Sequence, residues 1–397
     1  MTIPFLLAYG QMPVLSPGSR ASVAAAIVCV LVPVATACRS GCEKPLAVPG
    51  AVKGGPVCPT AGRIPRFDAH AHIQPDATSR ILALMDAWNI ARAINVSGGW
   101  EDGDVLLSAA VERETKGRII FFCNVDFTDW GTDAFPASAV ASLERCRGLG
   151  GRGLKIFKGL GLGLEYPDGR LVPVDDPILD PIFDRAGEMG MPVLVHSGDP
   201  KAFFQPITPE NERYEELEEH PGWSFYGEGF PTWEEVYRQF ESRVARSPGT
   251  TFIGAHFGND PEDPERVFQM LEDRPNLLID TAARVPEIGR FDPVRMRALF
   301  SKYEDRILFG TDVGISTKSL MLGSGPPYHP TDKEIERFFT ATWKYFETEE
   351  RGFDHPTAIQ GKWKIDGIGL DCGVLEKVYH GNVERLLGLG EESAKTR

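Results

Sequence analysis

The sequence of 397 residues lacks the short motifs that identify many nucleotide-binding and nucleophilic sites. It contains no P-loop, no GxSxG elbow, no HExxH helix and no CxxC pair. No run of Lys or Arg occurs either, and the formal net charge is −14. This charge balance argues against nucleic acid and against an anionic membrane surface as partners.

Charge is almost absent from the first 38 residues, in which Arg20 is the only charged side chain. The apolar run that follows, 21–37, has 17 residues, whereas a transmembrane helix needs about 20. A basic residue, a short apolar run and small residues before a cleavage point predict a secretory signal over 1–37. A retained membrane anchor is the alternative. We therefore expect an exported protein, either periplasmic or secreted.

The four residues 35–38, Ala-Thr-Ala-Cys, resemble a bacterial lipoprotein cleavage site, in which the Cys is acylated. Ala35 stands where Leu is usual, so ordinary cleavage stays open. A lipid on Cys38 would be the membrane attachment of the mature chain. Residues 38–62 are rich in Gly and Pro, and predict a tether in front of a folded domain over 63–390.

Cysteine is scarce, with seven in the chain. Cys42 and Cys58 flank the tether and could pair in an oxidising compartment. Cys123, Cys146 and Cys372 are scattered through the folded part, and we expect them to be free, buried thiols.

From residue 63 onward, short apolar runs alternate with longer helical patterns. Strands are expected at 64–69, 91–97, 118–125, 152–157, 191–196, 250–255, 275–280 and 305–310. Helices are expected near 78–88, 104–116, 136–147, 177–189, 232–246, 262–273, 286–300 and 331–347. β-then-α units with a repeat of about 30 residues predict an α/β fold, the (β/α)8 TIM barrel. A C-terminal extension with a closing helix at 381–388 follows.

One connection is much longer than the others. Residues 198–231 follow the fifth expected strand and are rich in Glu, Pro, Gly and aromatic side chains. Long loops in compact domains are usually functional. We expect this insertion either to cover a substrate or to pack on its own aromatics as a surface decoration.

Histidines and an aspartate stand at or near the carboxyl ends of expected strands. His70 and His72, two residues apart on the first strand, point to the same side of it. His196, His256 and Asp312 follow the fifth, sixth and eighth strands. In a TIM barrel these ends form one rim, where active sites are built, so we expect the side chains to converge.

Imidazole and carboxylate groups are ligands for Zn²⁺, and also for Mn²⁺ or Fe²⁺. A catalytic ion keeps one position for water and lowers its pKa towards about 7, which makes hydroxide available as a nucleophile. We therefore expect a divalent metal, with zinc as the first choice. A nearby His or Asp would move the proton.

Two cationic side chains complete the candidate set. Lys155 lies in the apolar fourth strand, where alternation points it into the barrel and turns Lys158 to the other side, towards solvent. Arg284 follows the seventh strand and could hold a substrate carboxylate through a bidentate pair, unless it lies on the surface.

The pattern resembles the amidohydrolase superfamily, in its amidohydrolase-related (amidohydrolase 2) branch. The matching motifs are Asp68-Ala69-His70-Ala71-His72, Val193-Leu194-Val195-His196, Gly254-Ala255-His256-Phe257-Gly258 and Phe309-Gly310-Thr311-Asp312. The resemblance covers about residues 64–390 and implies a (β/α)8 barrel with a divalent metal. It implies that His70, His72 and His196 are ligands. Asp312 would be a ligand or a proton shuttle, and His256 an acid/base or a carbonyl polariser.

Many members of the superfamily carry a carboxylated Lys on the fourth strand that bridges two metals. Lys155 is the candidate for that role here, and a substrate contact or a charge partner for Asp312 are its alternatives. We favour one metal per chain, with Lys155 beside it.

These observations favour a metal-dependent hydrolase that cleaves an amide, lactone or ester-like bond of a small molecule through metal-bound hydroxide. The substrate would be carboxylated or neutral. A metal-dependent, non-oxidative decarboxylase of a small carboxylic acid is the second interpretation, because the same branch includes such enzymes. An inactive, envelope-anchored binding protein is the third. Assembly into a homo-oligomer stays open.

Overall fold

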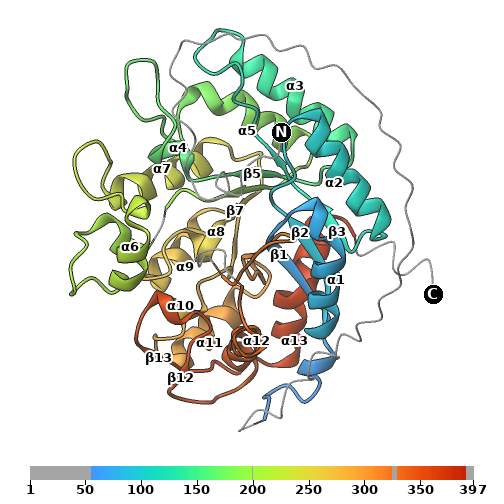
Figure 1. The fold of residues 1–397 in the computed structure, drawn as a ribbon, viewed down its shortest axis with the longest axis vertical. Helices are drawn as coiled ribbons and strands as arrows, with labels where there is room; N and C mark the ends of the chain where they lie inside the picture. Colours follow the sequence, from blue (N-terminus) through green and yellow to red (C-terminus); the bar gives the residue numbers. More distant parts are fainter. Residues whose placement is uncertain (1–54, 199, 324–328, 390–397) are drawn as a thin grey trace, which may run out of the picture.

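The structure, a computed structural model, describes residues 55–198, 200–323 and 329–389. The predicted signal at 1–37 and most of the predicted tether lie outside these residues. Figure 1 shows an α/β arrangement in which helices surround a core of parallel strands. Among the helices that the structure describes, none is long and apolar enough to span a membrane.

The strands follow the predicted order along the chain. They are β1 (Arg66–Ile73), β2 (Ile90–Asn95), β3 (Ile119–Phe121), β4 (Cys123–Asn124), β5 (Leu154–Ile156), β6 (Val193–Val195), β7 (Phe252–Gly254), β8 (Leu277–Asp280), β9 (Ile307–Leu308), β10 (Val313–Ile315), β11 (Leu320–Met321), β12 (Phe353–Asp354) and β13 (Lys364–Ile365). Each expected strand segment overlaps an observed strand, and the third is divided into β3 and β4. The strand predictions are therefore confirmed. Every residue of β1 is buried, as expected for a strand inside a parallel sheet.

The parallel strands form two sheets instead of one closed cylinder. Their orders are β11-β10-β1-β2-β3 and β4-β5-β6-β7-β8-β9, and β11 runs antiparallel to β10. Backbone hydrogen bonds also link the two sheets, among them those from Arg152 N to Phe121 O (2.9 Å) and from Ala69 N to Phe309 O (2.9 Å). Asp312 has a left-handed backbone (φ 58°), which interrupts the extended chain between β9 and β10. The prediction of a barrel implies one continuous, closed sheet, and such a sheet is not observed.

The helices lie between the strands, as predicted. They are α1 (Thr78–Ala87), α2 (Asp102–Glu114), α3 (Phe135–Gly148), α4 (Gly159–Leu162), α5 (Asp180–Glu188), α6 (Tyr214–Glu219), α7 (Trp233–Arg246), α8 (Ala255–Gly258), α9 (Pro264–Asp273), α10 (Val285–Ile288), α11 (Pro293–Lys302), α12 (Asp332–Glu347), α13 (Cys372–Glu376) and α14 (Asn382–Leu386). The helix expected near 286–300 is divided into α10 and α11. The division arises because Asp292 caps a new helix, where its carboxylate accepts a hydrogen bond from Arg295 N at 2.7 Å.

Two of the longest helices begin with a reciprocal cap that their sequences encode. At the start of α7, Thr232 Oγ1 accepts a hydrogen bond from Glu235 N, and Glu235 accepts one from Thr232 N. Thr331 and Glu334 do the same at the start of α12. Such capping boxes satisfy backbone donors that a helix start leaves open, so these boundaries follow from local sequence.

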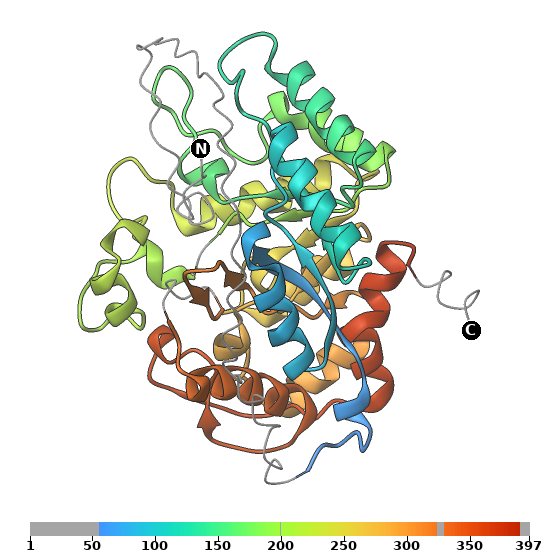
Figure 2. The same cartoon turned by 45° about the vertical axis from the view of Figure 1, so that its right-hand side comes forward.

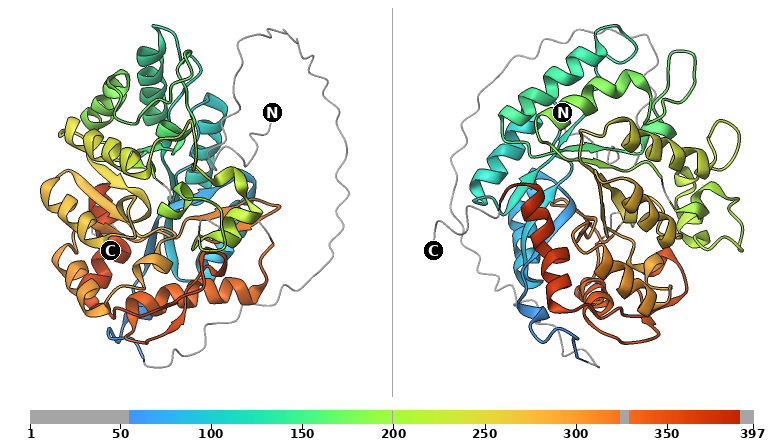
Figure 3. Two further views of the ribbon diagram at one scale, coloured as in Figure 1. Left: turned by 90° about the vertical axis from the view of Figure 1, so that its left-hand side faces the viewer. Right: turned by 180° about the vertical axis from the view of Figure 1, so that it is seen from behind.

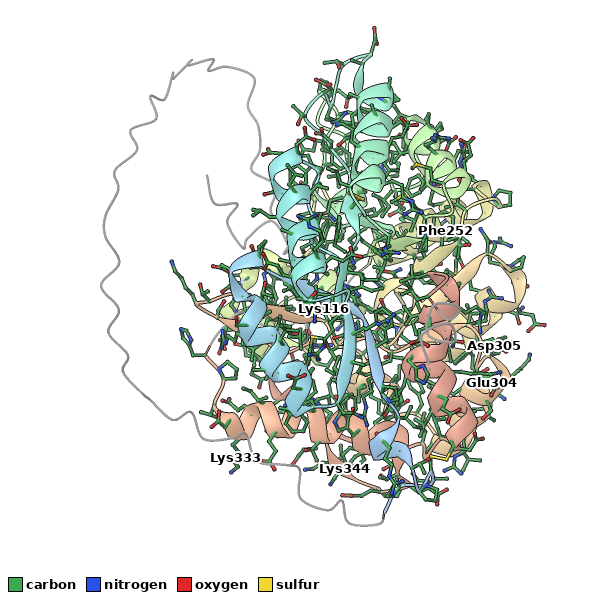
Figure 4. All side chains as sticks on the ribbon, turned by 90° about the vertical axis from the view of Figure 1, so that its right-hand side faces the viewer. Lys116, Phe252, Glu304, Asp305, Lys333 and Lys344 are labelled. Atoms are coloured by element: carbon green, nitrogen blue, oxygen red, sulfur yellow. A yellow bond between two sulfur atoms is a disulfide. The ribbon has the colours of Figure 1, made fainter. Side chains whose placement is uncertain are left out.

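The C-terminal helices close the amino ends of the strands. Apolar strand side chains inside the sheets form one cluster, which α14 joins through Val383. Lys377, in a π-helical turn between α13 and α14, forms ion pairs with Glu304 (2.6 Å) and Asp305 (3.1 Å), which precede β9 and are labelled in Figure 4. Figure 3 shows these helices, in red, on the face opposite to that of Figure 1. The carboxyl ends of the strands are not covered by these helices, and the candidate functional site lies there.

Two disulfides join parts of the chain that are distant in sequence. Cys58 is bonded to Cys372 on α13 across 314 residues, and Cys123 on β4 to Cys146 on α3 across 23. The expected pairing of Cys42 with Cys58 is therefore wrong, and so is the expectation that the other three are free thiols. The first pair becomes adjacent, with Cα atoms 4.9 Å apart, only when the C-terminal helices pack against the start of the domain.

Candidate functional site

A pocket opens among the carboxyl ends of the strands and encloses about 540 Å³, including space open to solvent. Its lining residues are His72, Phe157, Lys158, His196, Pro200, Phe203, Arg213, Glu216, Trp223, His256, Arg284, Asp312, Met321 and Gln360. They come from strand ends, from the insertion 198–231 and from the C-terminal segment. Figure 2 shows the insertion, in yellow-green, projecting at one edge of the fold.

Three predicted metal ligands come together at the base of this pocket. His70, His72 and Asp312 each offer a ligand atom, and these atoms all lie within 4.8 Å of one another. Asp312 Oδ1 is 3.3 Å from His72 Nε2 and 3.7 Å from His70 Nε2. All three residues are buried. The alternation of β1 places both imidazoles on the side where the eighth strand segment ends.

The protonation states of this cluster suit metal binding. Burial lowers the pKa of His72 below its usual value, although the carboxylate of Asp312 opposes this shift. For Asp312 burial acts upward, but the hydrogen bond with His72 and the neighbouring imidazoles bring its pKa well below the usual value. A neutral imidazole and an ionised carboxylate are the forms that coordinate a cation.

The predicted ligand His196 lies beside His256, with ring centroids 4.3 Å apart, and lines the pocket. Among the described residues two groups of three donors have ligand atoms within 4.8 Å. These are His70, His72 and Asp312, and His70, His256 and Asp280. His196 belongs to neither group, so its ligand role stays a prediction.

His256 has a defined tautomer and an unusual backbone. Its Nδ1 lies 3.0 Å from the carbonyl oxygen of Ala282, which accepts hydrogen bonds only, so Nδ1 carries the hydrogen and Nε2 a lone pair. Burial, with His196 and Arg284 nearby, lowers the pKa of His256 well below its usual value. The ring is therefore a neutral proton acceptor at neutral pH.

Residues at three strand ends around the pocket have left-handed backbones, with φ of 54° at His256, 59° at Ala283 and 58° at Asp312. This conformation costs an L-residue about 1–2 kcal/mol, and such strain is concentrated at functional sites. The folded core therefore holds two candidate catalytic residues in positions that the local chain does not favour.

Of the two lysines on the fourth strand segment, Lys155 lies where alternation placed it. It is 1% exposed, and its Nζ is 3.3 Å from His70 Nε2. Burial lowers the pKa of Lys155 to about 8, against the opposing effect of Asp280 and Asp312. Lys158 was expected in solvent, and this is wrong: it is 8% exposed and lines the pocket, because the insertion folds over it with Phe225 5.3 Å away.

Arg284 lies in the pocket wall, 3% exposed, which excludes the surface position that the sequence left open. Its Nη1 donates a hydrogen bond to Ala283 O at 3.2 Å, and within the described chain no carboxylate forms an ion pair with it. The carboxylates that interact electrostatically with Arg284 are Glu216, which is already paired with Arg213, and Glu262, which accepts a hydrogen bond from Lys201 N. The guanidinium of Arg284 therefore faces a pocket with capacity for an anion.

Side chains of the insertion both line the pocket and pack against one another, whereas the covering of a substrate stays a prediction. Phe203 and Trp223 line the pocket. They also pack in an apolar cluster with Leu162, Leu217, Phe225 and Val236. The insertion is thus an ordered wall with its own core.

Several residues of the site were missed from the sequence. Asp280 ends β8 and contacts both His70 and His256, and the strand-end rule that found His196 could have found it. Ser97 Oγ lies 2.6 Å from His72 Nδ1. Gln360 reaches the pocket from the C-terminal segment, and no pattern in its neighbourhood indicates this.

Comparisons with known proteins are consistent with this geometry. A family model described as Amidohydrolase (Amidohydro_2) matches residues 67–389. A search of curated proteins gives no match.

Solved structures similar to the chain include an uncharacterised TIM-barrel protein from Bordetella bronchiseptica (16% identity, TM-score 0.49, covering 83% of this chain and 99% of that one). A 2,6-dihydroxybenzoate decarboxylase from Rhizobium has 16% identity and a TM-score of 0.47, covering 82% and 99%. A 4-oxalomesaconate hydratase from Rhodopseudomonas palustris has 15% identity and a TM-score of 0.46, covering 83% and 98%.

Proposed function

The chain belongs to the amidohydrolase family and is an enzyme of this superfamily, and on that basis we propose that it is a metal-dependent hydrolase of a small molecule. The bond cleaved would be an amide, a lactone or another ester-like bond. The observation that carries the proposal is the buried cluster of His70, His72 and Asp312 beside the neutral imidazole of His256.

The donor set fits one divalent ion. Two imidazoles and one carboxylate, all buried and with ligand atoms within 4.8 Å, match the ligands that Zn²⁺, Mn²⁺ or Fe²⁺ prefer. His70, His72 and Asp312 would hold the ion, with His196 as the proposed fourth ligand, and zinc is the first choice. When bound, such an ion polarises a carbonyl oxygen and lowers the pKa of a coordinated water.

The chain's own residues supply the remaining chemistry. His256 Nε2 has a lone pair and accepts a proton from the attacking water, because Nδ1 is committed to Ala282 O. Asp312, held ionised beside His72, is the second group that can carry a proton towards the leaving atom. Phe157, Phe203 and Trp223 form an apolar part of the pocket wall, against which an apolar part of the substrate would pack.

Arg284 would bind a carboxylate of the substrate. Replacing Arg284 by Gln is expected to raise KM for a carboxylated substrate by about 10–100-fold, the effect of one lost charged hydrogen bond, with a smaller change in kcat. The measurement is a KM and kcat comparison on a carboxylated substrate and its methyl ester. Arg290→Gln, which removes an exposed ion pair with Glu212, is the matched control. Equal KM changes for acid and ester would contradict the assignment.

The same Arg284 also favours a second candidate function. A guanidinium that lines the same pocket as His196 and His256 and forms no ion pair within the described chain would hold the carboxylate of a substrate that loses CO₂. A non-oxidative decarboxylase is therefore the alternative. Release of CO₂ without consumption of water would identify it.

We also propose that the protein is exported and that its two sheets form the (β/α)8 barrel of the family. Disulfides persist in oxidising compartments, so the Cys58–Cys372 and Cys123–Cys146 bonds support export. The hydrogen bonds from Asp312 N to His70 O (2.8 Å) and from Arg152 N to Phe121 O (2.9 Å) support the barrel, because each joins segments on the two sides of a gap between the sheets. A lipid on Cys38 stays a proposal, as does a homo-oligomer.

The test of the hydrolase proposal uses the full chain purified without added metal. Elemental analysis is expected to find about one zinc or manganese per chain. Hydrolysis of a panel of lactones, N-acyl amino acids and carboxylate esters should disappear with EDTA and return with the ion. A chain that binds neither zinc nor manganese, or hydrolysis that EDTA leaves unchanged, would overturn the proposal.

A further inference from the structure

Asp280, the last residue of β8, lies behind the predicted metal ligands without facing the pocket. It is fully buried, and its two carboxylate oxygens have separate partners. Oδ2 is 2.9 Å from the Nδ1 atom of His70. Oδ1 accepts hydrogen bonds from the backbone nitrogens of His256 (2.9 Å) and Ala282 (3.0 Å). One buried carboxylate thus contacts one predicted ligand and the candidate base.

We infer that Asp280 is a positioning residue that fixes the tautomer of His70 and so makes its Nε2 atom available to a metal. The inference rests on the proposed function for the identity of the ion, and on the hydrogen bonds of His70 for the tautomer.

The tautomer follows from the two partners of the His70 ring. An ionised carboxylate only accepts hydrogen bonds, so a 2.9 Å contact with Asp280 Oδ2 requires the hydrogen on His70 Nδ1. At the other end of the ring, Lys155 Nζ lies 3.3 Å from Nε2 and donates to it as an ammonium. Both contacts require the same form, with Nδ1 protonated and a lone pair on Nε2. That lone pair is on the side of Asp312.

The same geometry makes Lys155 a competitor of the metal ion for the lone pair on His70 Nε2. A metal on His70 Nε2 needs the lone pair that Lys155 uses, so binding of the ion displaces the Lys155 hydrogen bond. Asp280 is different, because its contact is on the far nitrogen and persists when the ion binds. Carboxylates behind metal-ligating histidines hold the ring and raise its basicity in this way.

Asp280→Asn is the decisive variant, because Asn has nearly the same side-chain shape as Asp but reverses the direction of the hydrogen bond with His70 Nδ1. The Asn oxygen can still accept from His256 N and Ala282 N. Its amide nitrogen then faces His70 Nδ1 and donates to it, which moves the ring hydrogen to Nε2 and removes the lone pair. We expect zinc affinity, measured by competition with a chromogenic chelator, to fall by about 10–100-fold.

Asp68→Asn is the matched control. Asp68 is also buried, on β1, but among the described residues its oxygens accept hydrogen bonds only from His70 N (3.1 Å), Thr311 N (3.0 Å) and the Thr311 hydroxyl. It touches no imidazole nitrogen. A purely structural role for buried carboxylates would lower zinc affinity in both variants, whereas the inference expects the large loss only in Asp280→Asn. Equal losses would overturn it.

A second measurement needs no variant. In the metal-free wild type with ¹⁵N-labelled histidine, the ring shifts of His70 should report hydrogen on Nδ1, and a ring with hydrogen on Nε2 would overturn the inference.

Lys155→Met should tighten zinc binding, because it removes the competing donor. A wild type that binds no zinc would contradict the proposed function and leave the tautomer result standing, so the two failures are distinguishable.

Discussion

Replacement of His256 by Asn is expected to lower kcat/KM by about 10²–10⁴-fold while the protein keeps its metal, because the variant loses a positioned proton acceptor. His256 carries its hydrogen on Nδ1, towards Ala282 O, and presents Nε2 as a lone pair. Asn cannot accept a proton from water at neutral pH. The measurement is kcat/KM on the hydrolysed substrate, beside elemental analysis of the same preparation.

The matched control for this variant is His355→Asn. His355 is also buried, its Nε2 donates a hydrogen bond to Gly361 O (2.9 Å), and it is not among the residues that line the pocket. Its replacement is expected to cost stability and leave kcat/KM within a few-fold. A fully active His256→Asn enzyme would show that another group takes the proton, and Asp312 would then be the candidate. Loss of metal from His256→Asn would instead make His256 a ligand.

The pH dependence of activity is a second test of His256, because the direction of its pKa shift predicts how activity changes as pH falls. Because burial, His196 and Arg284 keep the pKa of His256 well below its usual value, the neutral form persists as pH falls below 6.5. Activity that depends on neutral His256 should therefore be retained into mildly acidic solution, and be lost only when the ring finally takes a proton.

Removal of the Cys58–Cys372 disulfide is expected to lower the free energy of unfolding by about 5–6 kcal/mol in the chain-entropy model. This bond closes a loop of 314 residues, whereas Cys123–Cys146 closes 23. The chain-entropy model gives only about 3 kcal/mol for the shorter loop. Double Ser variants of each pair, unfolded in urea as full chains, compare the two values directly.

The comparison of the two disulfides separates two explanations of their stabilising effect. If the unfolded chain is what the bonds constrain, the Cys58 and Cys372 double variant loses more stability than the Cys123 and Cys146 one. An equal or reversed order would instead indicate that local packing around each bond decides the effect.

Much of the fold follows from local sequence. The alternation of β1 predicts that His70 and His72 share a side, and their ring centroids lie 5.5 Å apart. The rule that active residues end barrel strands predicts the positions of His256 and Asp312, and both line the pocket. Such predictions succeed because strand periodicity and helix caps depend on residues that are neighbours in the chain.

The same reasoning could not reach contacts between distant segments. Asp280 and His70 are 210 residues apart, and Lys158 is buried only because the insertion folds over it. The expected partner of Cys58 and the expected free thiol of Cys123 are also wrong, since sequence spacing does not report which helices pack together.

The sequence by itself thus determined the order of strands and helices, the shared side of the two β1 imidazoles and the family. Only the tertiary structure decided which ring nitrogen of His70 and of His256 carries the hydrogen, and which carboxylates form ion pairs with Arg213. It also decided that Arg284 lines the pocket. The physical reason is that periodicity and capping are properties of a few consecutive residues. Tautomers, ion pairs and burial depend on groups that the folded core alone brings within hydrogen-bonding distance.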